Sequence, residues 1–384
     1  MTDRWTLRVC GALAATLFLL TSGVADAQLA VSANDAKVSL VDGVTVTNAH
    51  PAPDTVSIID LNVFPPRLLA TVEAPASVIG PPQSVAIAPD ESFALVTGAT
   101  KIDPADPTKT APNDALTVID LKTRKVVATL TAGQGASGVS INRAATLALV
   151  ANRAEGTVSI FTIAGMTLTP AGKIALGDAK SGPSHVVFTP DGRQALVTRD
   201  GDNKISVLAI DGAKVSYTGQ DMSAGIRPYG IVMSGRGDFA YVANIGAGAA
   251  DAATVSVIDL RATPPRVVNT ISVGPTPEGL ALSRDGRTLA VTVMNGSNLP
   301  KASPFFHDFG LLKLYRVNGA KLTLLASAHI GHWCQGVTFN RAATVLLAQC
   351  MADNEIEIFR LKGNKLSRAG ALAVTGPAGI RTAD

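Results

Sequence analysis

A two-stranded hairpin pattern recurs along this chain, and it restricts the possible folds more than any other feature. Its clearest copy is GPSHVVFTPDGRQALVT at 182–198, where the turn signal Pro190-Asp191-Gly192 separates two apolar runs. A third apolar run follows each turn, as in TVSVIDL (254–260), and a fourth usually comes after it. The seven copies have spacings of 45 to 56 residues, and their turn positions are Asp35, Asp90, Arg143, Asp191, Arg236, Asp285 and Arg341.

Four short strands in each of seven repeats predict an all-β fold, a seven-bladed β-propeller of four-stranded antiparallel blades. One such sheet cannot bury both of its faces alone, whereas a ring of sheets buries them against each other. A linear solenoid is the alternative, but neither terminus carries the polar cap that a solenoid needs. Composition agrees with short strands and tight turns, because 35 Gly and 22 Pro accompany only 16% charged residues.

The first 27 residues have the pattern of a secretory signal peptide. Arg4 and Arg8 precede the apolar run Val9–Leu20, and Ala25-Asp26-Ala27 is a small-x-small cleavage site. The apolar run is shorter than the roughly 20 residues of a membrane-spanning helix. We therefore expect 1–27 to be a signal peptide, 28–384 to be a single propeller domain in the periplasm or outside the cell, and no membrane span to remain after cleavage.

The net charge of +3 is small for 384 residues, and the basic residues are scattered along the chain. A nucleic-acid partner is therefore not expected. We expect a monomer whose partner is a small anionic molecule or a protein that binds the top face of the ring.

Some strand endings resemble a known family. Tyr241-Val242-Ala243-Asn244 and Leu149-Val150-Ala151-Asn152, together with VSVIDL and PDGR, resemble the YVTN-repeat family of exported bacterial seven-bladed propellers. The segment 182–192 is also similar to a blade of the propeller lactonases, which act on sugar lactones or muconolactone-type rings. That second resemblance transfers one residue, His185.

Candidate site residues lie where each innermost strand should begin. In a propeller these starts open on one face, the top, together with the loops between second and third strands, and ligands favour such concave mouths. The polar and aromatic residues at these positions are Gln83, His185, Arg227, Tyr229, Glu278, His332 and Trp333.

These side chains suit an anionic ligand. Arg227 offers a fork of donors to a carboxylate, Trp333 offers a flat apolar face, and His185 or Glu278 can move a proton. If a protonated histidine contributes, binding should weaken as pH rises. The alternative is a channel whose polar side chains hydrogen-bond only to water.

The site supports two interpretations of function. The first is a binding or interaction scaffold that works through its central funnel. The second is a lactonase-like hydrolase, in which His185 or Glu278 activates water and Arg227 stabilises the oxyanion.

Two insertions stand out from the repeat. Asn295–Gly310, which contains His307, predicts a flap over the mouth, with a packed surface loop as the alternative. Gly98–Asp114 carries Asp103, Asp106 and Asp114, which could bind a cation, although a solvated loop explains them better. His329 and His332 lack the further ligands of a zinc site, and no cofactor motif is present, so we expect neither a metal nor a cofactor.

Two further expectations concern the last repeat. Cys334 and Cys350 lie eight residues either side of the turn near Ala342, so they should face each other across two strands and form a disulfide. The segment 28–74 is interpreted as four complete strands of the first blade. The tail Gly376–Asp384 should then dock against that blade to close the ring.

Overall fold

A computed structural model describes residues 1–2, 28–248 and 251–383, and it confirms the seven-bladed propeller. All of the predicted signal peptide after its first two residues lies outside the described residues. Within them, strands form seven four-stranded antiparallel sheets and one two-stranded hairpin. No helix of this part of the chain has the length and apolarity to cross a bilayer.

The blades are numbered in chain order, and their strands are given from the axis outward. Blade 1 contains β30 (Pro377–Thr382), β1 (Leu29–Asn34), β4 (Thr55–Asp60) and β5 (Arg67–Glu73). Blade 2 contains β6 (Val85–Ile87), β7 (Phe93–Asp103), β8 (Asp106–Asp120) and β9 (Lys125–Thr131). Blade 3 contains β10 (Ala136–Ile141), β11 (Leu147–Asn152), β12 (Thr157–Ala164) and β13 (Thr167–Ala175).

The remaining blades follow the same order. Blade 4 contains β14 (Pro183–Phe188), β15 (Gln194–Arg199), β16 (Lys204–Asp211) and β17 (Lys214–Met222). Blade 5 contains β18 (Pro228–Met233), β19 (Phe239–Asn244), β20 (Thr254–Asp259) and β21 (Arg266–Ser272). Blade 6 contains β22 (Pro277–Leu282), β23 (Thr288–Val293), β24 (Gly310–Asn318) and β25 (Lys321–Ile330). Blade 7 contains β26 (Cys334–Phe339), β27 (Val345–Cys350), β28 (Glu355–Lys362) and β29 (Lys365–Ala373). The separate hairpin is β2 (Val38–Val41) with β3 (Val44–Thr47).

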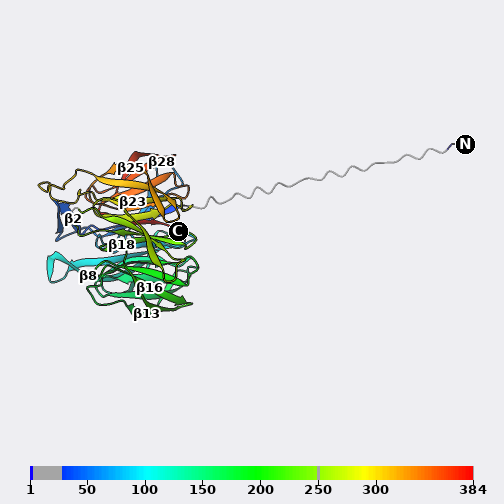
Figure 1. Cartoon of the computed structure of the whole chain (residues 1–384), viewed down its shortest axis with the longest axis horizontal. Coiled ribbons are helices and arrows are strands. Elements are labelled where there is room, and N and C mark those ends of the chain that lie inside the picture. Colours follow the sequence, from blue (N-terminus) through cyan, green and yellow to red (C-terminus); the bar gives the residue numbers. More distant parts are fainter. Residues whose placement is uncertain (3–27, 249–250, 384) are drawn as a thin grey trace.

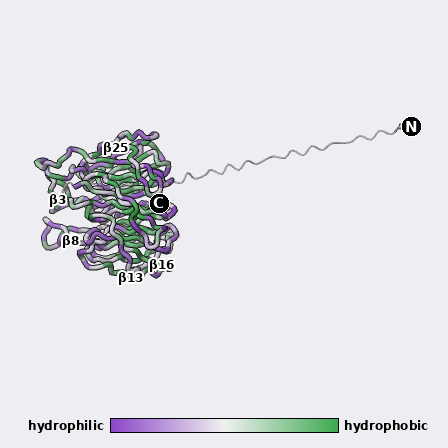
Figure 2. Tube along the Cα trace, in the orientation of Figure 1, coloured by the Kyte–Doolittle hydropathy of each residue, from purple (hydrophilic) through white to green (hydrophobic). Residues whose placement is uncertain are grey.

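The core consists of apolar clusters between neighbouring blades. One cluster joins Leu95 and Leu116 of blade 2 to Val150 and Phe161 of blade 3, all of them buried. Figure 2 shows the apolar segments gathered inside the ring and polar segments toward its periphery. The second and third strands are covered on both faces, which explains why they lack the polar alternation of a half-exposed sheet.

The recurring asparagine at the end of the second strand is a structural clip. Nδ2 of Asn152 donates to Oγ1 of Thr157 at 2.8 Å and to Oγ of Ser159 at 2.9 Å on the adjacent third strand. Asn34 and Asn244 make the same pair of bonds in blades 1 and 5. In these blades the Asn of the Ala-Asn motif therefore donates hydrogen bonds to the Thr and Ser hydroxyls of the Thr-Val-Ser motif, which joins the second strand to the third.

Blade 1 differs from the prediction. Leu29–Asn34 is its second strand and not its first, so Asp35 follows that strand and does not occupy the turn between first and second strands. The interpretation of 28–74 as four complete strands of this blade is therefore wrong. The innermost strand is β30, from the C-terminal tail, and it pairs antiparallel with β1. The expected docking of the tail on blade 1 is confirmed, and the tail closes the ring as a strand of the sheet.

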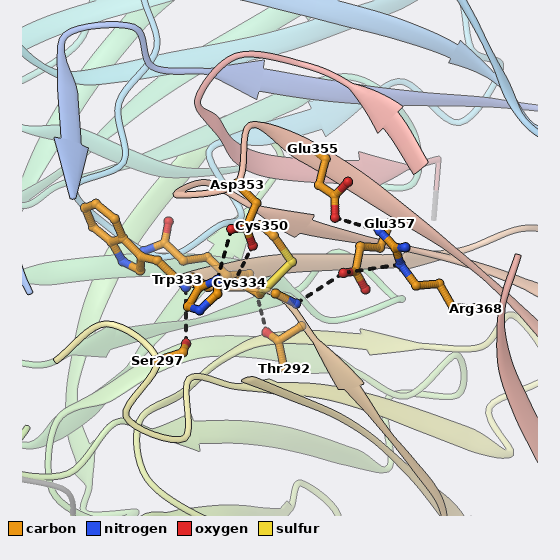
Figure 3. Close-up of a disulfide and its surroundings, with 12 residues drawn as sticks. Thr292, Ser297, Trp333, Cys334, Cys350, Asp353, Glu355, Glu357 and Arg368 are labelled. Carbon is orange, nitrogen blue, oxygen red and sulfur yellow. Dashed lines mark hydrogen bonds and ion pairs between the residues drawn. A yellow bond between two sulfur atoms is a disulfide. The ribbon is translucent and has the colours of Figure 1, made fainter. Parts of the chain in front are cut away.

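The predicted disulfide is confirmed. Cys334 and Cys350 are direct partners in the register of β26 and β27, with Cα atoms 3.9 Å apart and both side chains buried. Figure 3 shows the bond at the end of these strands, next to Trp333. Cys350 occupies the register of the clip asparagine, because it pairs with Glu355 as Asn152 pairs with Thr157.

We expect the disulfide to form in solution and to stabilise blade 7. Denatured, unreduced protein of residues 28–384 should show no free thiol, whereas two free thiols would contradict the bond. The double substitution Cys334→Ala and Cys350→Ala should lower the free energy of unfolding by about 2–4 kcal/mol, because the bond closes a short loop of the unfolded chain. Denaturant unfolding of both forms measures this difference.

Candidate functional site

Three insertions between second and third strands rise over the top of the ring. They are the β2–β3 hairpin of blade 1, the extended ends of β7 and β8 in blade 2, and residues 295–309 of blade 6. Figure 1 shows β2 and β8 projecting on the same side of the molecule. Gly98–Asp114, predicted as a loop, is therefore mostly a β-hairpin. In it, Asp106 pairs with Lys109 at 2.8 Å.

The base of the β2–β3 hairpin is held by buried charges. Nζ of Lys37 lies 3.0 Å from Oδ1 of Asp35, and it also pairs with Asp54 and donates to the carbonyl of Ala76. Oδ2 of Asp35 accepts the Val78 N–H at 2.8 Å. A buried lysine is stable only when its donors are satisfied, so Lys37 keeps these partners. The cluster therefore fixes the direction in which the hairpin leaves the ring.

A cavity of about 260 Å³ lies at the top centre of the ring, beneath the hairpin. Four predicted residues line it, Arg227, Tyr229, Glu278 and Trp333. Its other polar lining residues are Thr45, Arg153, Asn298 and Gln335, and its other large apolar ones are Leu40, Val78, Ile79 and Met294. A larger depression of about 560 Å³ lies among the turns of blades 3 and 4, around Arg143 and Asp191. The smaller cavity is the candidate site, because buried ionisable side chains converge on it.

The arginines of the cavity share one carboxylate. Nη2 of Arg153 lies 2.6 Å from Oδ2 of Asp200, and Nη2 of Arg227 lies 3.4 Å from the same oxygen. Nη1 of Arg153 donates to Oγ of Ser184 at 2.7 Å, and this hydroxyl donates to Oδ1 of Asp200. Two guanidinium groups against one aspartate leave a positive charge at the mouth while Glu278, which also lines the cavity, is protonated. An anion can bind there by charge-assisted hydrogen bonds.

Glu278 carries the clearest chemical signature of the site. Its side chain is buried, and Nε2 of Gln335 donates to its Oε2 at 2.8 Å. Burial raises the pKa of Glu278 to about 7, although Gln335, Arg227 and Arg153 act in the opposite direction. A carboxyl group with this pKa can accept and return a proton near neutral pH.

Two aromatic side chains complete the cavity. The guanidinium carbon of Arg153 lies 5.5 Å from the centre of the Tyr229 ring, a cation–π contact. Burial raises the pKa of the Tyr229 hydroxyl, so it stays protonated. Trp333 packs with Val38, Val78 and Met294, and this cluster gives the cavity one apolar wall.

The structure does not bring His185 into this cavity. Its side chain is buried where the inner strands of blades 4 and 5 meet, and its Nδ1 accepts the Ile231 N–H at 3.3 Å. Burial and the charge of Arg381 hold the pKa of His185 well below its ordinary value, so the ring is neutral. A protonated His185 therefore cannot supply the expected pH dependence of binding.

Gln83 and His332 lie beside the cavity and do not line it. Gln83 is buried at the axis and packs against Gly230 of blade 5. A Cβ atom added to Gly230 would lie only 3.0 Å from Nε2 of Gln83. His332 bonds two aspartates at the edge of the mouth. His329 stacks on Phe309, with ring centres 3.8 Å apart.

Sequence reasoning missed Arg153 and Asp200. Each directly follows the second strand of a blade, because β11 ends at Asn152 and β15 ends at Arg199. The ends of second strands open on the same face as the starts of innermost strands. Reading both sets of positions together would have found the pair.

One family model matches part of the chain. The family model described as "Lactonase, 7-bladed beta-propeller" matches residues 145–301. Over that segment the chain is similar to propeller lactonases. The matched segment contains Arg153, Asp200, Arg227, Tyr229 and Glu278. No curated protein sequence matches the chain significantly.

Solved structures agree on the fold. A Bacteroides uniformis protein proposed to be a 6-phosphogluconolactonase has a TM-score of 0.72 at 17% identity, covering 93% of this chain and 99% of its own. A counterpart from Bacteroides fragilis has a TM-score of 0.71 at 16% identity, with 94% and 99% covered. The periplasmic gluconolactonase of Pseudomonas aeruginosa has a TM-score of 0.67 at 16% identity, with 93% and 99% covered. At these identities the likeness establishes the propeller fold alone. The YVTN-repeat resemblance stays a prediction.

Proposed function

We propose that this chain is a hydrolase of small lactones and that it acts in the cavity at the top centre of the ring. The observation that carries the proposal is Glu278, a buried carboxyl group with a pKa of about 7 that lines the cavity together with two arginines. The match of 145–301 to the lactonase model supports it, because that segment supplies all three residues.

The proposed reaction needs only groups of the cavity. Deprotonated Glu278 takes a proton from water, and the water oxygen bonds to the lactone carbonyl carbon. Negative charge then develops on the former carbonyl oxygen, where the N–H groups of Arg227 and Arg153 stabilise it. The ring C–O bond breaks, the departing alkoxide takes the proton back from Glu278, and the product is a hydroxy acid.

Gln335 orients the base for this role. Its bond to Oε2 of Glu278 fixes the carboxyl group and leaves Oε1 for a water molecule. Arg153 is in turn held by Asp200 and Ser184, so its guanidinium group is in position before the substrate binds. Such preorganised donors are what oxyanion stabilisation requires.

The lining of the cavity also narrows the substrate. A volume of about 260 Å³ suits a single small molecule and not a peptide segment. The arginines favour a substrate that is anionic or becomes anionic, whereas Leu40, Met294 and Trp333 favour an apolar portion on its other side. A compact lactone with a polar end and an apolar face fits both walls.

A binding scaffold that uses the same funnel is the second candidate. It needs the arginines but no group that moves a proton. The raised pKa of Glu278 favours the hydrolase. General-base catalysis uses a carboxyl group that gains and loses a proton near pH 7, whereas binding alone does not require one.

We infer that the protein is exported. The signal-peptide pattern at 1–27, the disulfide of blade 7 and the periplasmic location named for the Pseudomonas aeruginosa gluconolactonase support this. Fractionation of cells that express the full-length chain tests it. Mature protein should be recovered outside the cytoplasm with a new N-terminus near Gln28.

Hydrolysis should depend on pH through Glu278. Because the base must be deprotonated and burial raises its pKa to about 7, kcat/KM should fall tenfold per pH unit below about 7 and reach a plateau above it. The measurement is acid release from a panel of sugar, alkyl-substituted and carboxylated lactones between pH 5 and 8.5, corrected for spontaneous hydrolysis. Failure to hydrolyse any of these lactones would overturn the proposal.

A further inference from the structure

Residues 295–309, here called the strap, bound the cavity from blade 6. Asn298 lines the cavity, and Oγ of the buried Ser297 accepts the Trp333 N–H at 3.2 Å. Farther along, Pro300 lies against Gly43 of the β2–β3 hairpin, and the Lys301 N–H donates to Oδ1 of Asp42 at 2.8 Å. The strap and the hairpin therefore meet over the mouth of the cavity.

The other end of the strap is held by a histidine between two carboxylates. Nε2 of His332 lies 3.0 Å from Oδ1 of Asp308, on the strap, and Nδ1 lies 3.0 Å from Oδ1 of Asp353, after β27. The His332 backbone N–H also donates to Oδ2 of Asp353 at 2.6 Å, so this aspartate is fixed to the blade. Figure 3 shows Asp353 beside the disulfide and Trp333.

This arrangement is complete only when His332 is charged. Two ionised carboxylates offer acceptors alone, so both ring nitrogens must carry a hydrogen to satisfy them. A neutral ring has one N–H, and its unprotonated nitrogen would face a carboxylate lone pair. Asp353 receives a second bond from the backbone, so the contact that fails on deprotonation is the one to Asp308.

Other titratable groups lie on the elements around His332. Oε1 of Glu357 accepts the Gly331 N–H, and Arg368 pairs with both Glu357 and Glu355. His329 and His307 both contact the ring of Phe309 at the end of the strap. Burial lowers the pKa of His332, but Asp308 and Asp353 outweigh burial and raise it above the ordinary value.

We propose that His332 is a proton-operated latch, which holds the strap over the cavity when it is protonated and releases it as pH rises. The consequence for catalysis rests on the proposed function, because closure retains substrate only if the cavity is the working site. The latch itself is a property of the strap and is testable without any substrate.

A direct test follows the strap by amide hydrogen exchange between pH 5.5 and 8.5 in protein of residues 28–384. After correction for the intrinsic pH dependence of exchange, protection of strap amides should fall on the order of tenfold as His332 deprotonates, because one charge-assisted hydrogen bond is lost. Fluorescence gives a second readout. Trp333 is the single tryptophan of 28–384, and its backbone N–H donates to Ser297 of the strap.

Four variants assign the transition. His332→Gln should remove it and leave the strap weakly protected at every pH, and Asp308→Asn should move it to lower pH. Glu278→Gln and Glu357→Gln serve as matched controls, because both carboxyl groups also titrate near pH 7, and each should keep the transition. A transition that is absent from the wild type, survives in His332→Gln, or disappears in Glu357→Gln would overturn the latch. Hydrolysis without the transition would refute the latch alone, and the transition without hydrolysis would refute the proposed function alone.

Discussion

Deletion of residues 376–384 is expected to leave the ring unable to close and to lower the melting temperature by about 10 °C or more. The segment supplies β30, which pairs with β1 from Ala30 to Asn34 and buries Ile380 in an apolar cluster with Leu347 and Ile358 of blade 7. It also receives a hydrogen bond at the Gly379 carbonyl from Nε2 of Gln349. Loss of one buried isoleucine costs about 2–5 kcal/mol, and the exposed strand edge adds to that cost.

Thermal unfolding followed by circular dichroism measures this effect. The matched control removes only residues 383–384, which follow β30, and should change the melting temperature far less. An unchanged melting temperature in the longer deletion would mean that face packing between blades 1 and 7 holds the seam without the strand.

Glu278→Gln should reduce the rate of lactone hydrolysis by about 100-fold to 10,000-fold, the usual contribution of a positioned general base. Glutamine keeps the shape of the side chain and an oxygen that accepts from Gln335, so the cavity should remain intact. The product hydroxy acid should bind the variant at least as well as the wild type, because a negative charge has been removed from the anion site. Steady-state kinetics and calorimetry with the same lactone and its product separate the two effects.

Glu357→Gln is the control for this substitution. Glu357 is also buried and burial also raises its pKa to about 7, but it lies on β28 and does not line the cavity. Its substitution should leave hydrolysis unchanged. Equal losses in both variants, or full activity in Glu278→Gln, would remove Glu278 from the mechanism.

Most of the fold could be predicted because each blade repeats the same local signals. The turn Pro190-Asp191-Gly192 and the runs around it mark two strands, and their spacing marks the next blade. Blade 1 was misread because its first strand lies at the other end of the chain, so its repeat begins at a second strand. The clip asparagine gives the true alignment, since Asn34 stands in the register of Asn152 and Asn244.

The site was less predictable, because strand position does not tell which way a side chain points. Arg227, Glu278 and Trp333 start innermost strands and line the cavity, whereas His185 starts one and is buried against its neighbour. Arg153 has no signal of its own in the sequence. Its role depends on Asp200, which lies 47 residues away and approaches only when blades 3 and 4 pack together.

The pairing of β1 with β30 also determines when the ring can close during synthesis and folding. The innermost strand of the first blade comes after every other strand of the ring in the sequence, so blades 2 to 7 can assemble in order of synthesis while blade 1 still lacks its axial strand. A nascent chain therefore remains an open arc until β30 has been synthesised. If the chain crosses a membrane before it folds, this order delays completion of the ring until β30 has emerged on the far side.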